Sequence, residues 1–184
     1  MKLLLASHNE NKLRELRAVL PAWEVDLLEA ADEPVEDGTT FVDNARIKAR
    51  HGRRFAAGDA WVAGEDSGIE VAALDGRPGV ESARWATDGV AKLLSELGDG
   101  ANRRARYVCE LVVVDPAGAE TRASGTLEGE IAYERRGEEG FGYDPIFVPN
   151  GESLTVAELG NAWKAEHSHR ARAARALAQT LDER

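Results

Sequence analysis

Two adjacent carboxylates stand between glycines in residues 64–68, which read Gly-Glu-Asp-Ser-Gly. The apolar residues 60–63 before this segment indicate a short buried strand, and residues 69–71 after it indicate another. We therefore predict that Glu65 and Asp66 lie at a strand end that opens into a cleft. Carboxylates in a cleft need a metal ion or a cationic group to offset their desolvation. An acidic turn on the surface is the alternative that this segment alone leaves open.

A second polar segment follows the continuous apolar run at residues 2–6. It consists of Ser7, His8, Asn9, Glu10, Asn11 and Lys12, and apolar residues at helical spacing come after it. A strand, a polar loop and a helix in this order aim a helix N-terminus at an anion, so we predict phosphate binding. The segment is not a Walker A loop, because the GxxxxGK(S/T) pattern is absent. The alternative is a Ser or Asn helix cap beside an exposed Lys12.

Glu36 and Asp37 come just before a predicted helix that runs from Phe41 to about Phe55. Carboxylates ahead of a helix favour its dipole, and that explanation needs no functional site. Together with Asp66, however, Glu36 offers the oxygen ligands that Mg²⁺ prefers. Mg²⁺ with lysine and arginine binds phosphates, so these groups make a nucleotide phosphohydrolase plausible.

An aromatic loop and a cationic cluster complete the set of residues that could bind a nucleotide. The loop consists of Phe141, Gly142, Tyr143 and Asp144, and the cationic cluster of Lys164, His167, His169 and Arg170. Such a loop places a ring flat against a planar ligand such as a base. The alternative is that Phe141 and Tyr143 pack into the core. The cationic cluster opens a predicted C-terminal helix, residues 161–184, in a chain that is otherwise acidic.

The composition limits the class of protein. The chain has 184 residues and a net charge of −10, with 43% hydrophobic residues, which fits a single domain with a sizeable core. The negative charge argues against a nucleic-acid polymer or an anionic membrane as partner. Since no apolar run approaches about 18 residues and no signal peptide is found, we expect a cytoplasmic protein. The single cysteine, Cys109, is expected to be a buried core thiol.

The order of predicted elements indicates a mixed sheet. Strand and helix alternate in the N-terminal half, whereas strands are predicted close together at residues 106–114, 120–125, 129–133 and 146–148. A short helix capped by Thr155, with Glu158 in a capping box, precedes the C-terminal helix. We therefore predict an α/β fold whose sheet combines parallel and antiparallel strands.

In the order and spacing of these segments, the chain resembles the inosine triphosphate pyrophosphatase family nearly end to end. The matching segments are residues 7–12, 36–45, 65–69, 76–85 and 140–147, with Lys164 and residues 168–170. The first corresponds to the family pattern Ser/Thr-x-Asn-x-x-Lys. Members remove deaminated purine nucleoside triphosphates. Any one segment is weak evidence, but six in register are strong.

The resemblance implies the roles of individual residues. Asp66 corresponds to the proton acceptor and to a carboxylate at the metal, Glu36 to the other acidic residue near Mg²⁺, and Ser67 to a substrate contact. Residues 7–12 correspond to the triphosphate-binding loop. The residues around the base and sugar-phosphate correspond to Phe141, Gly142, Tyr143, Asp144, Lys164, His169 and Arg170.

The resemblance also implies an elongated mixed β-sheet with flanking helices, which form two lobes around a central nucleotide-binding cleft. Residues 1–184 would make one such two-lobed domain, usually paired as a homodimer. The chain departs from many members at Ser7-His8, where they have Thr-Gly, and at Asp37, where Thr is frequent. Before Asp66, where many members have Asp or Glu, this chain has Glu65. These departures affect fine specificity and remove no catalytic group.

The expected activity is Mg²⁺-dependent hydrolysis of ITP, dITP, XTP or dXTP to the monophosphate and pyrophosphate, before these nucleotides enter DNA or RNA. Selectivity over adenine requires donors that face the 6-oxo group, and His169, Arg170 and the N–H groups near Phe141 are the candidates. Two alternatives stay open. One is a related phosphatase for a different substrate, such as a modified pyrimidine triphosphate, and the other is a nucleotide-binding protein without catalysis.

Overall fold

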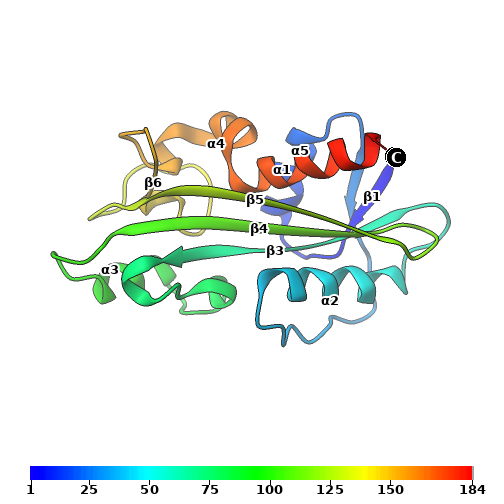
Figure 1. Ribbon diagram of the computed structural model, residues 1–184, viewed down its shortest axis with the longest axis horizontal. Coiled ribbons are helices and arrows are strands. Elements are labelled where there is room, and N and C mark those ends of the chain that lie inside the picture. The colour runs from blue at the N-terminus through cyan, green and yellow to red at the C-terminus, as the bar shows by residue number, and fades with distance from the viewer. Residues whose placement is uncertain (184) are drawn as a thin grey trace.

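A six-stranded sheet forms the spine of the protein in the computed structural model, which describes residues 1–183 (Figure 1). The strands are β1 (Lys2–Leu5), β2 (Glu24–Leu27), β3 (Trp61–Val71), β4 (Arg104–Val114), β5 (Glu120–Ile131) and β6 (Phe147–Pro149). Their order across the sheet is β2-β1-β3-β4-β5-β6. β1 runs parallel to β2 and β3, and the remaining neighbours are antiparallel. The predicted mixed α/β architecture is confirmed.

Helices flank the long strands on both sides (Figure 1). They are α1 (Glu10–Val19), α2 (Phe41–Arg53), α3 (Gly89–Glu96), α4 (Val156–His167) and α5 (His169–Asp182). In Figure 1, α2 and α3 lie below the long strands, whereas α4 and α5 lie above them. Within residues 1–183, no helix is both long enough and apolar enough to cross a membrane.

Local sequence signals set several helix ends. The side chain of Asn9 caps α1 by accepting hydrogen bonds from the N–H groups of Asn11 and Lys12, at 2.9 and 3.2 Å. Thr155 and Glu158 form the predicted capping box at the start of α4. The C-terminal helix differs from the prediction, because Ser168 divides it into α4 and α5 and caps the second. The last residue of that prediction, 184, lies outside the described residues.

The prediction of a strand end at residues 64–68 is wrong, because β3 continues through them to Val71. Every residue from Val62 to Val71 has a partner on β4. The two glycines are not turn residues. A side chain at Gly64 would collide with the backbone of α2, and one at Gly68 would collide with the carbonyl of Gly79. Both glycines are needed because other chain segments press closely against the strand.

Two predicted strands, residues 120–125 and 129–133, are likewise joined in one strand, β5, which ends at Ile131. Thr126, Leu127 and Glu128 pair with β4, and buried and exposed residues alternate along the whole of β5. The polar residues between the two predictions belong to the exposed face of the strand, and they do not interrupt it. The predicted strand at residues 146–148 is shifted, since a 3-10 turn covers Asp144–Ile146 before β6.

The end of β1 creates the space for a site. β1 pairs with β3 only as far as Leu5 and Ala63. Beyond Ala63, among the described residues, that edge of β3 meets only an isolated bridge between Glu70 and Pro78. The chain leaves β1 for β2 on one side and later returns to β3 on the other, which is a topological switch point. Ligands of open α/β sheets bind outside the carboxyl ends of strands at such a point.

Candidate active site

Asp66 and Glu36 converge on one ammonium group, that of Lys48. The Nζ atom of Lys48 lies 2.9 Å from Oδ1 of Asp66 and 2.8 Å from Oε2 of Glu36. It also donates to the carbonyl of Glu65 at 3.2 Å. Lys48 comes from α2, Asp66 from β3, and Glu36 from the segment before α2. The side chain of Asn44, one helical turn before Lys48, donates to Oδ2 of Asp66 at 3.4 Å. Two carboxylates from different elements are thus directed at one point.

The surroundings of Asp66 raise the pKa of its carboxyl group. Burial raises its pKa above the ordinary aspartate value, and Lys48 partly offsets that shift. Burial lowers the pKa of Lys48, but Asp66 and Glu36 outweigh this and raise it above the ordinary lysine value. Lys48 therefore keeps its charge, while Asp66 is a carboxylate with a greater affinity for a proton than an exposed one.

Glu65 points to the opposite face of the sheet from Asp66, because successive side chains of a strand alternate. It is fully buried and lies between two cations, 2.5 Å from Nζ of Lys12 on α1 and 3.0 Å from a guanidinium nitrogen of Arg170 on α5. The Cys109 thiol, buried as predicted, donates to it at 3.3 Å. Burial alone would raise the pKa of Glu65, but Lys12 and Arg170 hold it well below its usual range. Glu65 remains ionised, and it fixes both cations.

The loop between β1 and α1 lines a cavity of about 630 Å³. The wall of this cavity includes Ser7, His8, Asn9, Glu10, Asn11 and Lys12, with Glu36, Lys48, Asp66 and Ser67. Ser7 Oγ accepts from the N–H of Asn9 at 3.1 Å, and His8 Nδ1 contacts the carboxylate of Glu33. The alternative of an exposed Lys12 is wrong, since its side chain is 15% exposed and pairs with Glu65. Asn9 therefore caps α1, and Lys12 on the same helix still lines the cavity.

A second cavity, of about 390 Å³, adjoins the first, since Asn9, Lys12, Ser67 and Ala83 line both. Its wall carries the remaining predicted residues, namely Phe141, Gly142, Tyr143, Asp144, Lys164, His169 and Arg170. The ring of Phe141 is only half-buried and has the ammonium of Lys164 at 4.6 Å from its centre. Tyr143 is buried and donates to the carbonyl of Ser82 at 3.0 Å. Phe141 therefore faces the cavity, whereas Tyr143 packs into the core.

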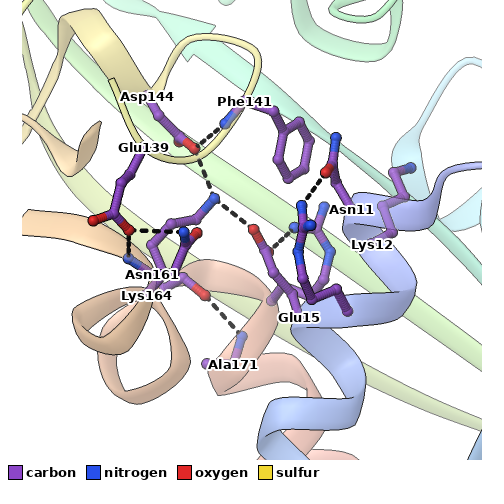
Figure 2. A network of polar contacts seen from close by, with 12 residues as sticks. Asn11, Lys12, Glu15, Glu139, Phe141, Asp144, Asn161, Lys164 and Ala171 are labelled. Atoms are coloured by element: carbon purple, nitrogen blue, oxygen red, sulfur yellow. Dashed lines mark hydrogen bonds and ion pairs between the residues drawn. The ribbon is translucent and has the colours of Figure 1, made fainter. Parts of the chain in front are cut away.

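A buried network of ions holds the inner wall of this second cavity (Figure 2). Lys164 lies 2.6 Å from Oδ2 of Asp144 and 2.5 Å from Oε1 of Glu15. Glu15, on α1, also pairs with Arg170, which donates to Ser67 Oγ at 2.9 Å. The N–H of Phe141 donates to Asp144 at 2.8 Å, so that backbone donor is already used. The network joins α1, α4, α5 and the aromatic loop into one wall.

His169 is the buried polar group of this wall that lacks a partner. Its Nδ1 forms no hydrogen bond with the described part of the chain, and its ring stacks on Tyr107 at 4.5 Å with an angle of 7°. Burial and the neighbouring Arg170 hold the pKa of His169 well below its ordinary value, so the ring is neutral. A buried polar atom without a partner is unfavourable, so this ring is an unusual feature of a wall that otherwise pairs its polar groups.

The structure brings all the sequence-predicted site residues to these two cavities, and it adds three that the sequence interpretation missed. Lys48 and Glu15 lie in none of the matching segments, and Asn44 lies in the segment 36–45 but was given no role. Lys48 and Asn44 are one turn apart on the face of α2 that also carries Phe41 and Ala45. A lysine and an asparagine on the apolar face of an amphipathic helix could have indicated a buried polar contact.

The acidic pair fits a magnesium site. Within residues 1–183, no group of three or more His, Cys, Asp or Glu side chains gathers around one point. Magnesium, however, is often bound by one or two carboxylates together with waters and substrate phosphates. Asp66 and Glu36 already share one cation, the Lys48 ammonium, at the wall of a cavity that the loop of residues 7–12 also lines. The donor set therefore fits a cation held jointly with a phosphorylated ligand.

The sequence and the fold of the chain are both similar to those of known proteins. A sequence model described as the Ham1 family matches residues 3–180. The chain belongs to the Ham1 family. Among its Ham1-family relatives, a dITP/XTP pyrophosphatase of Exiguobacterium sp. is 45% identical, over 96% of this chain and 95% of the relative. A protein of the same name from Bdellovibrio bacteriovorus is 41% identical, over 98% of each chain.

The Ham1 fold is also seen in solved structures. The Ham1 protein of Staphylococcus aureus superposes with a TM-score of 0.87 at 35% identity, and the match covers 100% of this chain and 99% of that one. The sheet and its flanking helices are therefore those of the Ham1 family. The two cavities lie within an arrangement that this family shares.

Proposed function

We propose that this Ham1-family protein hydrolyses deaminated purine nucleoside triphosphates, such as dITP, ITP and XTP, to the monophosphate and pyrophosphate. One observation carries the proposal. The carboxylates of Asp66 and Glu36 converge on the Lys48 ammonium beside the loop of residues 7–12. A second cavity, with aromatic and ionic walls, adjoins that point. The names of the relatives, dITP/XTP pyrophosphatase, support the same substrate class.

In the proposed reaction, Asp66 orients a water molecule and accepts its proton. The water oxygen forms a bond to the α-phosphorus while the bond from that phosphorus to the bridging oxygen breaks, and pyrophosphate leaves with that oxygen. The raised pKa of Asp66 makes its carboxylate a better proton acceptor than that of an exposed aspartate. Lys48, which is 2.9 Å from Asp66, keeps the carboxylate ionised before the reaction and compensates the charge around it.

The residues of the first cavity would bind the triphosphate. The loop of residues 7–12, which leads into the N-terminus of α1, lines the same cavity as Asp66 and carries the Lys12 side chain. Glu36 and Asp66 would hold Mg²⁺, which supplies charge neutralisation for the phosphates when it is bound. Charge-assisted hydrogen bonds from Lys12 are expected to strengthen as charge develops on the leaving pyrophosphate.

The second cavity would bind the base. Phe141 offers a ring for stacking, and His169, whose side chain lines the same cavity, is the candidate partner for the edge of the base. An adenine amino group in place of the 6-oxo group would leave a donor unpaired, at a cost of about 1–3 kcal/mol. Of the donors named from the sequence, Arg170 is already engaged by Glu15, Glu65 and Ser67, which leaves His169 as the freer candidate.

The proposal is tested by a substrate panel of ITP, XTP, GTP and dUTP, with and without Mg²⁺. Pyrophosphate release from ITP and XTP, abolished by chelation of the metal, is the expected result. Preference for dUTP, or release of orthophosphate, would indicate a different nucleotide phosphatase, and binding without turnover would indicate a non-catalytic protein. The variant Asp66→Asn should lose about 10²–10⁴-fold in turnover. Asp37→Asn, in which an exposed carboxylate near Glu36 is changed, is the matched control.

The resemblance supports three further proposals about the protein as a whole. We propose that the chain acts as one two-lobed domain, as a homodimer and in the cytoplasm. Light scattering on the purified protein measures the mass of the assembly, and a mass equal to one chain of 19.9 kDa would contradict the dimer. A single cooperative unfolding transition is expected for one domain.

A further inference from the structure

Helix α4 is interrupted in its middle. Gly160 has φ of 85° and ψ of 175°, values outside the helical region, so the hydrogen-bond ladder is broken there. Residues 161–167 therefore form a second helical piece with its own N-terminus. The unpaired N–H groups at such a terminus need an acceptor. Lys164, which lies in the wall of the second cavity, belongs to this piece.

Glu139 fills the gap from outside the helix. Its Oε2 accepts from the backbone N–H of Asn161 at 2.8 Å and from the Asn161 side chain at 2.7 Å (Figure 2). The N–H of Glu139 donates in turn to the carbonyl of Ala157 at 3.4 Å. The residue thus caps the second helical piece and also bonds to the first. A carboxylate at a helix N-terminus is favourable for the helix dipole as well.

This cap connects the two segments that carry the inner wall of the second cavity. Glu139 is two residues before Phe141, whose N–H donates to Asp144 at 2.8 Å. Asn161 is three residues before Lys164, whose ammonium lies 2.6 Å from Asp144 and 4.6 Å from the centre of the Phe141 ring. Figure 2 shows Glu139 with Asn161 on one side of this group and Phe141 on the other. Loop and helix therefore meet at Asp144 inside the cavity and at Glu139 outside it.

We propose that Glu139 is a positioning residue for the base-binding wall formed by Phe141, Asp144 and Lys164. Glu139 does not line either cavity, so it acts through these residues and does not touch the nucleotide. This inference rests on the proposed function, in which the second cavity binds the base of the nucleotide. Its consequence is specific: loss of the cap weakens interactions with the base and leaves those with the triphosphate unchanged.

The experiment compares Glu139→Ala, Glu139→Gln and the control Glu138→Ala, a neighbouring carboxylate that is also exposed. In Glu139→Ala, KM for ITP should rise about fivefold with kcat nearly unchanged, the effect expected from loss of one helix cap. Inhibition by inorganic triphosphate, which has no base, should be unchanged. Glu139→Gln keeps an acceptor oxygen and should recover most of the affinity. Glu138→Ala should behave as the wild type.

Two measurements separate this inference from the proposed function. Calorimetric binding of ITP in the Asp66→Asn background reports affinity without turnover, so a shift caused by Glu139→Ala stands even if the reaction is a different one. Hydrogen exchange at the Asn161 amide should accelerate in Glu139→Ala and not in Glu139→Gln. Equal weakening of ITP and inorganic triphosphate, a loss confined to kcat, or an unchanged ITP affinity would each overturn the inference.

Discussion

Glu65 and Asp66 are neighbours in the sequence, but their carboxylates lie on opposite faces of the sheet and pair with different cations. Glu65 meets Lys12 and Arg170 from the face of α1 and α5, and Asp66 meets Lys48 from the face of α2. β3 therefore has cationic side chains against both of its faces at this point, Lys12 and Arg170 on one and Lys48 on the other. The two carboxylates differ in their electrostatics as a result, since the pKa of Glu65 is lowered whereas that of Asp66 is raised.

Replacement of Lys48 by Met should shift the acid limb of the pH–activity profile. Lys48 lowers the pKa of Asp66, so its removal lets burial raise that pKa further. The proposed reaction uses ionised Asp66, and activity should therefore be lost at a higher pH than in the wild type. The measurement is kcat/KM against pH at saturating Mg²⁺. Lys48→Arg, which keeps the charge, should shift less, and an unchanged profile in Lys48→Met would exclude this role for Lys48.

Replacement of Glu65 by Gln should strongly destabilise the fold. It leaves Lys12 and Arg170 without their shared buried counter-charge, a loss of about 3–5 kcal/mol in the free energy of unfolding. Because the pKa of Glu65 is lowered in the folded state, its contribution is fully present above about pH 4.3 and is lost only as the pH falls through the lowered value.

The difference between wild type and Glu65→Gln in urea denaturation should therefore be constant between about pH 6 and pH 8. Glu70→Gln is the matched control on the same strand. Glu70 pairs with Arg106 at 2.6 Å, but the Arg106 side chain is 50% exposed, so the change should be below about 1 kcal/mol. A similar loss in both variants would contradict the distinction between the buried and the exposed pair.

His169 should make stability depend on pH. Its folded pKa lies below that of the unfolded chain, so the unfolded state binds more protons as the pH falls below about 6.5. The free energy of unfolding should therefore decrease by up to about 1.4 kcal/mol per pH unit in that range. His169→Phe keeps an aromatic ring against Tyr107 and should remove this slope. His167→Phe, at a half-exposed position, should retain it.

Replacement of Gly64 by Ala should destabilise the protein without affecting any charged group. The new methyl group would collide with the carbonyl of Ala45 and the N–H of Ala49, where α2 crosses β3. Overpacking of this kind costs about 1–3 kcal/mol, measured as a lower midpoint of thermal unfolding. Gly98→Ala, which meets open space at an ordinary φ, is the control. Equal midpoints for the two variants would show that α2 can move away from the strand.

The sequence by itself determined the features that depend on near neighbours. The Asn9 and Thr155 caps, the helix of α2 and the mixed order of strands all follow from signals a few residues apart. Residue types in register indicated the family and with it the candidate site. Such patterns are readable because a cap or an amphipathic face is formed by residues close together in the chain.

Only the tertiary structure decided the features that depend on distant segments. β3 continues through Gly64 and Gly68 because β4 pairs with it throughout, whereas the local pattern indicated a break. The sequence places Lys48 on the apolar face of a helix without naming its partner, and Lys48 becomes part of the site because α2 packs over Asp66. Glu65 and Asp66 form one acidic pair in the sequence, and the alternation of a strand separates them. Burial and charge compensation are set by what lies opposite, which local sequence does not contain.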